Sequence, residues 1–447
     1  MISLRQSLTA RPATAPLWRY GDVWRTVGEV LAAAADFAGT LPSGRIALAF
    51  ADDEALARAM LAAEGRCESV LLVPSSWNQA LLERYLPIAG TELLVTDRAD
   101  LTGPRVLRVG IGQVSATPAK PIEPGETRWI IPTSGTTGEP KLVEHSLATL
   151  ARTVRTDQAK GRDLTWGLVY ELARFAGLQV FFQAVLGGSR LAFVRREAGI
   201  EALAADLAAA GCNALSATPT LWRRLLMAPA ADGLPLRLVT LGGEIADQAI
   251  LTLLATRFPA ARILHIYAST EAGVGFSVTD GRAGFPLSFL QEPPRGIELK
   301  VDLTGMLWVR PALVGQRFLG GAQALQSLDG WINTGDQVRL EQDRWIFLGR
   351  ANGAINVGGN KVFPEEVEDC IRSVSGVRHV GVRARSNPLV GSLVEAFVQP
   401  DPAFDRTILK TAIVKSCRAT LAPYKVPAVV TWVDDVPMNA AGKLVRV

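Results

Sequence analysis

Cysteine and histidine are scarce in this chain, which has four cysteines and three histidines among its 447 residues. The cysteines, Cys67, Cys212, Cys370 and Cys417, stand far apart, and none belongs to a CxxC pair. The histidines are equally scattered, so neither residue type suggests a metal-binding cluster. We therefore expect reduced, mostly buried thiols of the kind found in cytosolic proteins.

Long apolar stretches and charge of a single sign are also missing. No uncharged run approaches the roughly 18 residues of a membrane-spanning helix, and the first residues lack the apolar core of a signal peptide. The net charge is +4, with Lys and Arg interspersed among Asp and Glu, which argues against a basic surface for nucleic acid or lipid. We expect a cytoplasmic protein with no nucleic-acid partner and no integral-membrane segment.

Short apolar runs alternate with helical patterns in the first part of the chain. Helical patterns such as DEALARAMLAAEG (53–65) and IADQAILTLLATRF (245–258) separate runs that read as strands. This alternation is typical of an α/β protein with a mostly parallel sheet, whose ligands bind at the carboxyl ends of the strands. The expected strands are RIALAF (45–50), SVLLVP (69–74), NALSATP (213–219), LRLVTLGGE (236–244) and RILHIYAS (262–269).

The pattern changes after residue 300. GMLWVRP and RWIFLGR read as short antiparallel strands separated by DGWINTGD. A Gly-rich hairpin, an acidic helix, two strands, a basic helix and a last strand follow. Because a single core rarely exceeds about 250–300 residues, the chain should divide. We expect an N-terminal α/β domain over residues 1–349 and a small α+β domain over residues 350–447, joined by a short hinge.

The segment TSGTTGEPK (133–141) gathers glycines and hydroxyl groups after a strand and ends in a lysine. It differs from the usual phosphate loop, in which the lysine directly follows a glycine and precedes Ser or Thr. Its glycines let backbone N–H groups approach an anion, and Lys141 adds charge for a β- or γ-phosphate. A flexible surface turn is the alternative, but a turn needs neither four hydroxyls nor a lysine. The predicted polyphosphate site comprises Thr133, Ser134, Gly135, Thr136, Thr137, Gly138 and Lys141.

Four further motifs follow in order: YASTEAG (267–273), INTGDQV (332–338), GRANGAINVGGNKVFPEEVE (349–368) and PMNAAGK (437–443). Together with the segment at 133–141, they resemble the motifs of the adenylate-forming superfamily, which includes acyl-CoA synthetases, luciferases and peptide-synthetase adenylation domains. One match would be weak, but five in order are specific. The resemblance implies a large N-terminal domain of mostly parallel sheets flanked by helices and a small, mobile C-terminal domain.

The resemblance also implies nucleotide contacts, although each residue has an ordinary structural alternative. Tyr267 would stack on the adenine or be a core tyrosine, and Glu271 would hold Mg²⁺ or cap a helix. Asp336 would clamp the ribose or form a turn, and Arg350 would reach the ribose or α-phosphate or form a surface salt bridge. The other implied nucleotide-binding residues are Gly243, Glu244, Ala268 and Ser269, and Thr270 joins Glu271 as a catalytic residue.

Members of the superfamily join a carboxylic acid to AMP, release pyrophosphate and then transfer the acyl group to a thiol. The resemblance implies an AMP-forming acid–thiol ligase that uses ATP, Mg²⁺ and coenzyme A. The phosphopantetheine of an acyl carrier protein is the alternative acceptor, and a non-catalytic nucleotide-binding relative is the less favoured reading. Lys443 would bridge the carboxylate and the α-phosphate. The small domain would then rotate about Asn352, where relatives usually have Asp or Lys, and present Gly358 and Gly359 to the pantetheine arm.

The acid-binding residues follow only from their placement in the chain, and the segment YELARFAGLQVF (170–181) occupies the position of the acyl-pocket helix of relatives. Relatives often have His or an aromatic residue where this chain has Arg174, which either pairs with a polar group of the substrate, forms a structural ion pair or points to solvent. Phe175 replaces the aspartate that pairs with the substrate ammonium in amino-acid-activating relatives, which argues against an amino-acid substrate. The expected pocket residues are Arg174, Phe175, Gly177, Ser216 and Thr218.

Overall fold

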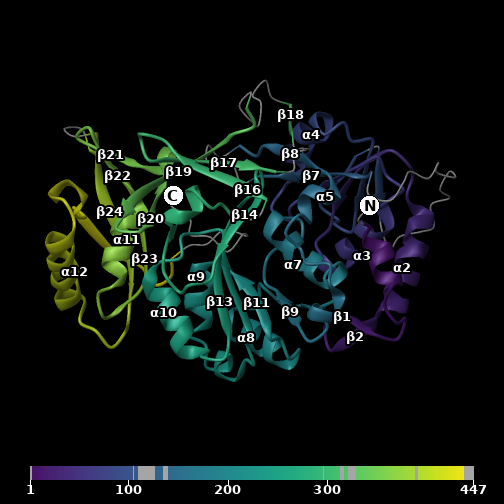
Figure 1. The fold of residues 1–447 in the computed structure, drawn as a ribbon, viewed down its shortest axis with the longest axis horizontal. Coiled ribbons are helices and arrows are strands. Elements are labelled where there is room, and N and C mark those ends of the chain that lie inside the picture. Colours follow the sequence, from purple (N-terminus) through teal and green to yellow (C-terminus); the bar gives the residue numbers. More distant parts are fainter. Residues whose placement is uncertain are drawn as a thin grey trace.

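The structure is a computed structural model that describes residues 3–103, 105–108, 126–133, 139–294, 296–312, 317–320, 329–387 and 391–436. Its strands form four sheets, two of them mainly parallel (Figure 1). The N-terminal helices lie at one end of the molecule and the C-terminal sheet at the other.

The first sheet is mainly parallel, and it contains the two strands that flank the segment 133–141. It consists, in order, of β18 (Arg317–Leu319), β8 (Leu142–His145), β7 (Arg128–Pro132), β4 (Ser69–Leu72), β3 (Arg45–Ala49), β5 (Leu93–Thr96) and β6 (Val106–Arg108). The strands from β7 to β6 are parallel, whereas β8 and β18 add antiparallel neighbours at one edge. All four residues of β4 are buried, as expected for a parallel strand covered on both faces.

The second sheet is also mainly parallel, with an antiparallel strand at each edge. It consists, in order, of β14 (Gly273–Val278), β13 (Arg262–Ser269), β12 (Leu238–Gly242), β11 (Ala214–Ala217), β9 (Thr165–Leu168), β10 (Arg190–Phe193), β1 (Pro16–Tyr20) and β2 (Val23–Thr26). The strands expected at 45–50, 69–74, 213–219, 236–244 and 262–269 are all present, each within a few residues of its expected bounds.

Helices cover both faces of these two sheets. One group packs between the sheets: α1 (Leu4–Thr9), α2 (Val27–Thr40), α3 (Asp53–Ala63), α5 (Leu147–Leu150) and α7 (Phe175–Val185). The outer faces are covered by α4 (Gln79–Ile88) on the first sheet and by α8 (Ile200–Ala209), α9 (Pro219–Leu225) and α10 (Gln248–Arg257) on the second. The short α6 (Gln158–Gly161) precedes β9.

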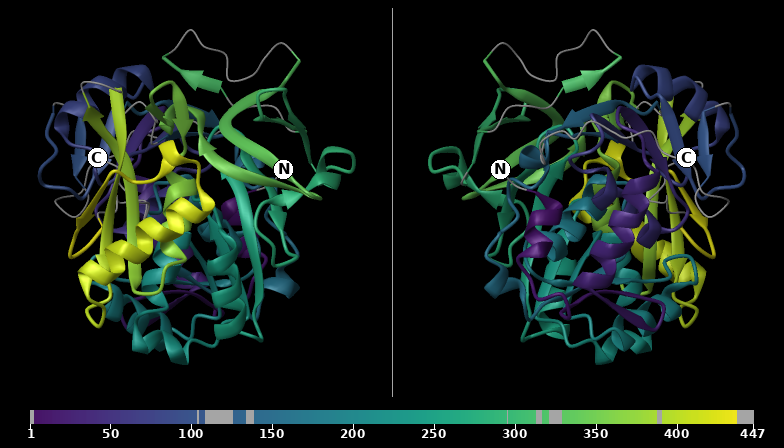
Figure 2. Two further views of the ribbon diagram at one scale, coloured as in Figure 1. Left: turned by 90° about the vertical axis from the view of Figure 1, so that its left-hand side faces the viewer. Right: turned by 90° about the vertical axis from the view of Figure 1, so that its right-hand side faces the viewer.

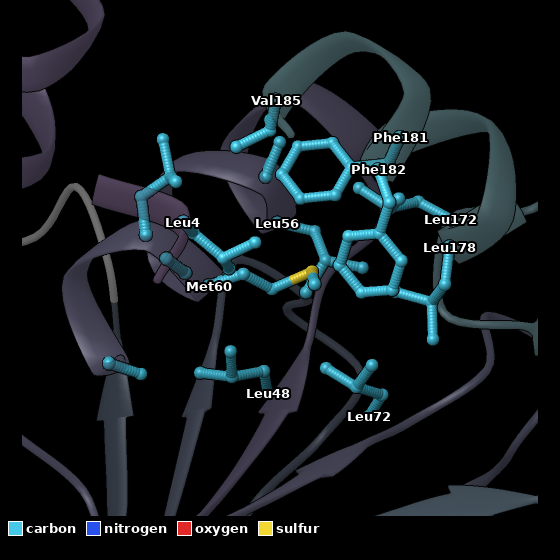
Figure 3. Close-up of a cluster of buried hydrophobic side chains, with 14 of the residues drawn as sticks. Leu4, Leu48, Leu56, Met60, Leu72, Leu172, Leu178, Phe181, Phe182 and Val185 are labelled. Atoms are coloured by element: carbon cyan, nitrogen blue, oxygen red, sulfur yellow. The ribbon is translucent and has the colours of Figure 1, made fainter. Parts of the chain in front are cut away.

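The layer between the two sheets is the main hydrophobic core. Figure 3 shows Met60 of α3 among the rings of Phe181 and Phe182 from α7, above Leu48 and Leu72 of the first sheet. All five side chains are almost completely buried. Burying an apolar side chain of this size contributes about 1.5–3 kcal/mol, so this layer fixes the two sheets against each other.

A third sheet is antiparallel and consists of β15 (Phe285–Pro286), β20 (Arg344–Arg350), β19 (Ile332–Glu341), β17 (Met306–Pro311) and β16 (Ile297–Val301), in that order. Antiparallel strands at 305–311 and 344–350 were expected, and both are present. The expectation that DGWINTGD merely separates them is wrong, because most of that segment belongs to β19. This strand lies between β17 and β20 and bonds to both, so Asp336 sits on a strand opposite Arg350.

The C-terminal unit, residues 355–432, has its own sheet and core (Figures 1 and 2). Its strands are β22 (Asn360–Val362), β21 (Ile355–Val357), β24 (Gly391–Pro400), β23 (Val377–Asn387) and β25 (Val429–Trp432), covered by α11 (Pro364–Arg372) and α12 (Arg406–Thr420). The short 3-10 turn Ala351–Gly353 connects this unit to β20. The predicted α/β fold with a separate small α+β unit is confirmed, whereas the domain boundary at 349/350 stays a prediction.

No helix within the described segments has the length and apolar character needed to cross a membrane.

Gly177 in α7 offers a test of the layer between the sheets. A Cβ at this position would lie 2.2 Å from the backbone oxygen of Glu171. Gly39 in α2, by contrast, has no atom within 4 Å of a Cβ. Gly177→Ala should therefore destabilise the protein by about 1–3 kcal/mol, the cost of overpacking. Gly39→Ala should stabilise it by up to about 1 kcal/mol, since Ala favours helices. Thermal unfolding of both variants checks this, and equal melting temperatures would contradict the close contact.

Candidate active site

A cavity of about 460 Å³ lies where the carboxyl ends of β12 and β13 meet the third sheet and the C-terminal unit. Eleven of the sequence-predicted residues line it, although they come from all three sheets of the N-terminal part. They are Thr133, Lys141, Gly243, Glu244, Tyr267, Ala268, Ser269, Thr270, Glu271, Asp336 and Arg350. Predicted residues that are up to about 200 positions apart in the sequence thus surround one space.

The part of the cavity near the predicted polyphosphate segment combines a cation with a carboxylate. Two backbone-linked contacts join the ends of the predicted loop: the Thr133 amide donates to the Lys141 carbonyl at 2.8 Å, and the Lys141 amide donates to Thr133 Oγ1 at 3.3 Å. The loop residues Ser134, Gly135, Thr136, Thr137 and Gly138 lie outside the described residues. Lys141 and Glu271 line the same cavity, a donor set that suits a triphosphate and a hard, oxygen-liganded ion such as Mg²⁺.

The turn after β12 forms another wall of the cavity. Gly243 has a φ of +80°, in the left-handed region that favours glycine, and this conformation turns the chain directly into the cavity wall. Glu244 follows, and its carboxylate accepts a hydrogen bond from the Thr220 amide at 2.9 Å, in the first turn of α9. Glu244 thus fixes a helix N-terminus in addition to lining the cavity.

Asp336 is held in place by two other predicted residues. The Tyr267 hydroxyl donates to Asp336 Oδ2 at 2.6 Å, and Arg350 Nη1 lies 3.3 Å from Asp336 Oδ1. Burial, together with the Asp336 charge, raises the pKa of Tyr267 well above its usual range, so the phenol stays a donor. The sequence patterns gave these residues separate roles on the nucleotide, and the structure adds a direct hydrogen-bond network among them.

The ring of Tyr267 belongs to an aromatic cluster. It is nearly parallel to Phe276 of β14, with 5.1 Å between ring centres and 19° between planes, and to Phe347 of β20, at 5.3 Å and 14°. Phe347 also lines the cavity. Sequence reasoning missed Phe347, because alternating apolar residues in a short strand give no signal beyond burial.

The C-terminal unit supplies residues that the motifs did not indicate. Glu365, Glu368, Asp369 and Arg372 of α11 line the cavity, as do Arg223 and Arg224 of α9. The acidic character of α11 was visible in the sequence, but only the arrangement of the two units shows that it faces the cavity. Asp435 and Val436, just beyond β25, also line it.

None of the expected acid-binding residues is among those that line this cavity, and two have clear structural roles. Thr218 caps α9 by accepting from the Leu221 amide at 3.1 Å, and Gly177 allows the close backbone contact described above. Arg174 forms an ion pair with Glu171 at 3.2 Å and donates to Ser76. Phe175 and Ser216 also lie outside the residues that line the cavity.

The hinge and thiol-channel residues remain predictions. Asn352 lies in the turn that follows β20. Gly358 and Gly359 have φ values of +56° and +87° at the exposed turn between β21 and β22, and they do not line the cavity. Lys443 lies outside the described residues, seven positions beyond Val436.

Two buried histidines are held neutral. Burial lowers the pKa of His145 to about 4, against an opposing effect of the Thr270 backbone. Burial also lowers the pKa of His379 to about 4, and the charges of Arg223 and Arg224 act in the same direction. His379 lines the cavity, whereas His145 ends β8 and precedes Ser146, the N-cap residue of α5.

Comparison with known families identifies both parts of the chain. Residues 26–316 match the family model of the AMP-binding enzymes, and residues 366–443 match the model of the AMP-binding enzyme C-terminal domain. The chain belongs to the AMP-binding enzyme family.

Curated relatives of this AMP-binding enzyme include CoA ligases. A 2-succinylbenzoate–CoA ligase of Listeria monocytogenes is 26% identical over 332 residues, covering 70% of this chain and 68% of the relative. A 4-coumarate–CoA ligase-like protein of Oryza sativa is 25% identical over 501 residues, covering 100% of this chain and 89% of the relative.

Solved structures share the fold over nearly the whole length. An anthranilate CoA ligase in complex with anthranoyl-AMP aligns with a TM-score of 0.82 at 17% identity, covering 99% of this chain and 95% of the other. A benzoate CoA ligase from Burkholderia xenovorans aligns with a TM-score of 0.80 at 20% identity, covering 99% of both chains. The predicted adenylate-forming fold is therefore confirmed.

The neutral histidines predict how stability depends on pH. Their pKa values in the folded protein lie below the usual 6.5, so the unfolded chain binds protons more readily than the folded protein. The free energy of unfolding is therefore unaffected by these residues above pH 6.5 and decreases as the pH falls toward 4. At pH 5, each of the two histidines should lower the free energy of unfolding by about 2 kcal/mol. His379→Gln should therefore lose less melting temperature than the wild type between pH 7 and pH 5. An identical loss in both proteins would show that His379 is not held neutral.

Proposed function

We propose that this AMP-binding enzyme is an AMP-forming acid–thiol ligase that activates a small carboxylic acid, of the aryl or acyl class, and transfers it to coenzyme A. The main support is the cavity that brings together the phosphate-loop lysine, the Thr–Glu motif and the Asp336 network. Loading of an acyl carrier protein is the alternative for the second step, and a purely nucleotide-binding role is less favoured.

The two steps follow from the chemistry of a carboxylate, which is a poor electrophile because its leaving group would be oxide. In the first step, a carboxylate oxygen attacks the α-phosphorus of ATP, and pyrophosphate leaves to give the acyl-adenylate. In the second step, a thiolate attacks the acyl carbon, and AMP leaves with the electron pair of the broken C–O bond. Mg²⁺, when bound to ATP, neutralises triphosphate charge. The protein's contribution is mainly positioning and charge stabilisation.

We assign the nucleotide roles by combining the resemblance with the cavity geometry. Lys141 and Glu271 serve the triphosphate and its metal ion, and Asp336, oriented by Tyr267 and Arg350, accepts hydrogen bonds from the ribose. A carboxylate already fixed by two donors loses little conformational freedom when a ligand binds.

The position of the C-terminal unit supports a role for Lys443 in the first step. Asp435 and Val436 line the cavity, and the chain continues from them toward Lys443. The turn at Gly358 and Gly359 is exposed and away from the cavity. We infer that this orientation serves adenylate formation and that rotation about Asn352 would exchange the two segments for thiol transfer.

The relatives favour an aryl acid and coenzyme A. The named substrates of similar enzymes are 2-succinylbenzoate, anthranilate and benzoate, and all of these enzymes are named as CoA ligases. The side chain at position 175 is Phe rather than an acidic residue, so a substrate ammonium would lack a charge partner there.

A panel of acids tests the proposal. Purified protein is mixed with ATP, Mg²⁺ and one acid at a time, and pyrophosphate release is followed without and then with coenzyme A. We expect release with at least one aryl or acyl acid, formation of its CoA thioester, and no exchange with the standard amino acids. Fast pyrophosphate exchange with an amino acid alone, or no exchange with any acid, would contradict the proposal.

Lys443→Ala separates the two steps. A charge-stabilising donor present only during adenylate formation should, when removed, slow that step by about 10²–10³. Conversion of synthetic acyl-adenylate to thioester should stay near the wild-type rate. Single-turnover kinetics of each step provide the measurement, and Lys410→Ala, which changes an exposed lysine of α12, provides the control. Equal losses in both steps, or none, would refute the assignment.

A further inference from the structure

A buried group of charged side chains joins the C-terminal unit to the second sheet's helices. Asp247 caps α10 by accepting from the Ile250 amide at 3.0 Å. Its Oδ2 atom also contacts two guanidinium groups, those of Arg223 from α9 and, at 3.1 Å, of Arg372 from α11. The three side chains are between 12% and 18% exposed, so the contacts are largely removed from solvent.

The group is balanced in charge. Asp369 of α11 completes it by contacting Arg372 within the same helix, giving two carboxylates and two guanidinium groups. Burial alone would raise the pKa of Asp247, but Arg223 and Arg372 hold it below its ordinary value. A carboxylate that stays charged while buried requires such partners, because an unpaired buried charge is strongly unfavourable.

Movement of the C-terminal unit would break one contact of this group and leave the others in place. Asp247–Arg223 lies within the N-terminal part, and Arg372–Asp369 lies within α11, so both can persist in any orientation. The Arg372–Asp247 contact alone within the group joins the two parts. Its separation would leave each charge with one remaining partner.

Within the part of the chain that the structure describes, the ion pairs Arg224–Asp435 and Arg339–Glu366 also join these parts, but they are longer and more exposed. Arg224 lies 3.9 Å from Asp435, which is 63% exposed, and Arg339, which is 52% exposed, lies 3.7 Å from Glu366. Exposed pairs of this kind contribute little to stability. Arg372 is therefore the cation best placed to favour the observed orientation.

Cavities border this contact on two sides. Arg372 and Asp369 line the cavity described above, and they also line a second cavity of about 660 Å³ between α10, β15, the β19–β20 turn and the end of α11. Groups bordered by two cavities can be resolvated as soon as they separate. This makes the contact strong enough to bias the orientation and still reversible.

We infer that Arg372 is a positioning residue, which acts through Asp247 to hold the C-terminal unit in the orientation that brings the chain leading to Lys443 to the cavity. The inference rests on the proposed function for its kinetic consequence, but its structural consequence is independent of any substrate. Loss of the contact should slow adenylate formation and leave thioester formation from the adenylate unchanged or faster.

Arg372→Gln tests the inference, with Arg378→Gln as the matched control. Arg378 lies on β23 of the same unit, and its partner Asp401, at 3.4 Å, belongs to that unit too. We expect adenylate formation to fall about tenfold in Arg372→Gln, as for loss of one charge-assisted contact, with no change in Arg378→Gln. Arg372→Lys, which keeps the charge but not the fork of donors, should recover part of the rate.

Hydrogen–deuterium exchange without substrates provides the independent measurement. Peptides covering α11 and the N-terminus of α10 should exchange faster in Arg372→Gln than in the wild type, and the core strands β23 and β24 should be unchanged. Inactivity of the wild type toward every acid would refute the proposed function and leave the exchange result to decide the contact. Unchanged exchange, or equal slowing of both steps, would overturn the inference. If Arg372→Gln does not fold, the same comparison is made with Arg372→Lys, where unchanged exchange would likewise overturn it.

Discussion

The active site depends on the apolar layer that two parallel sheets share. Thr133 directly follows β7 and Lys141 directly precedes β8, both strands of the first sheet. Thr270 and Glu271 follow β13 of the second sheet. They face the same cavity because α3 and α7 pack tightly between the sheets, with Met60 among the aromatic side chains of α7. A nucleotide site built across two sheets is therefore as rigid as the layer between them, which close packing makes resistant to deformation.

Much of this arrangement could be predicted from the sequence, for a physical reason. Alternating strands and helices define parallel sheets, and parallel strands place their polar carboxyl-end residues at one edge. The motifs around residues 133–141 and 267–273 each lie at such a strand end, one on the first sheet and one on the second. The five expected strands of the N-terminal part also form close to their predicted bounds, and the acidic and the basic C-terminal helix are both present, because their hydrophobic periodicity is regular.

The contacts that could not be predicted are those between elements of different sheets. The hydrogen bond from Tyr267 to Asp336 and the pairing of Arg372 with Asp247 depend on how sheets and units pack. The strand β19 was also not predicted, because Asn333, Gly335 and Asp336 are poor strand formers. Pairing with the neighbouring strands overrides this low strand propensity. The acid-binding residues were inferred from their placement in the chain alone, and the structure gives Gly177 and Thr218 local roles in the fold.

The close approach at Gly177 has a consequence for how this enzyme could diversify. A larger side chain at this position would bring its first carbon against the peptide backbone of Glu171 rather than against a side chain that can turn away. Position 177 cannot accept a larger residue unless the backbone between β9 and α7 shifts. The fold itself therefore keeps position 177 a glycine, whichever acid the enzyme accepts, and a designer of a variant inherits the same restriction.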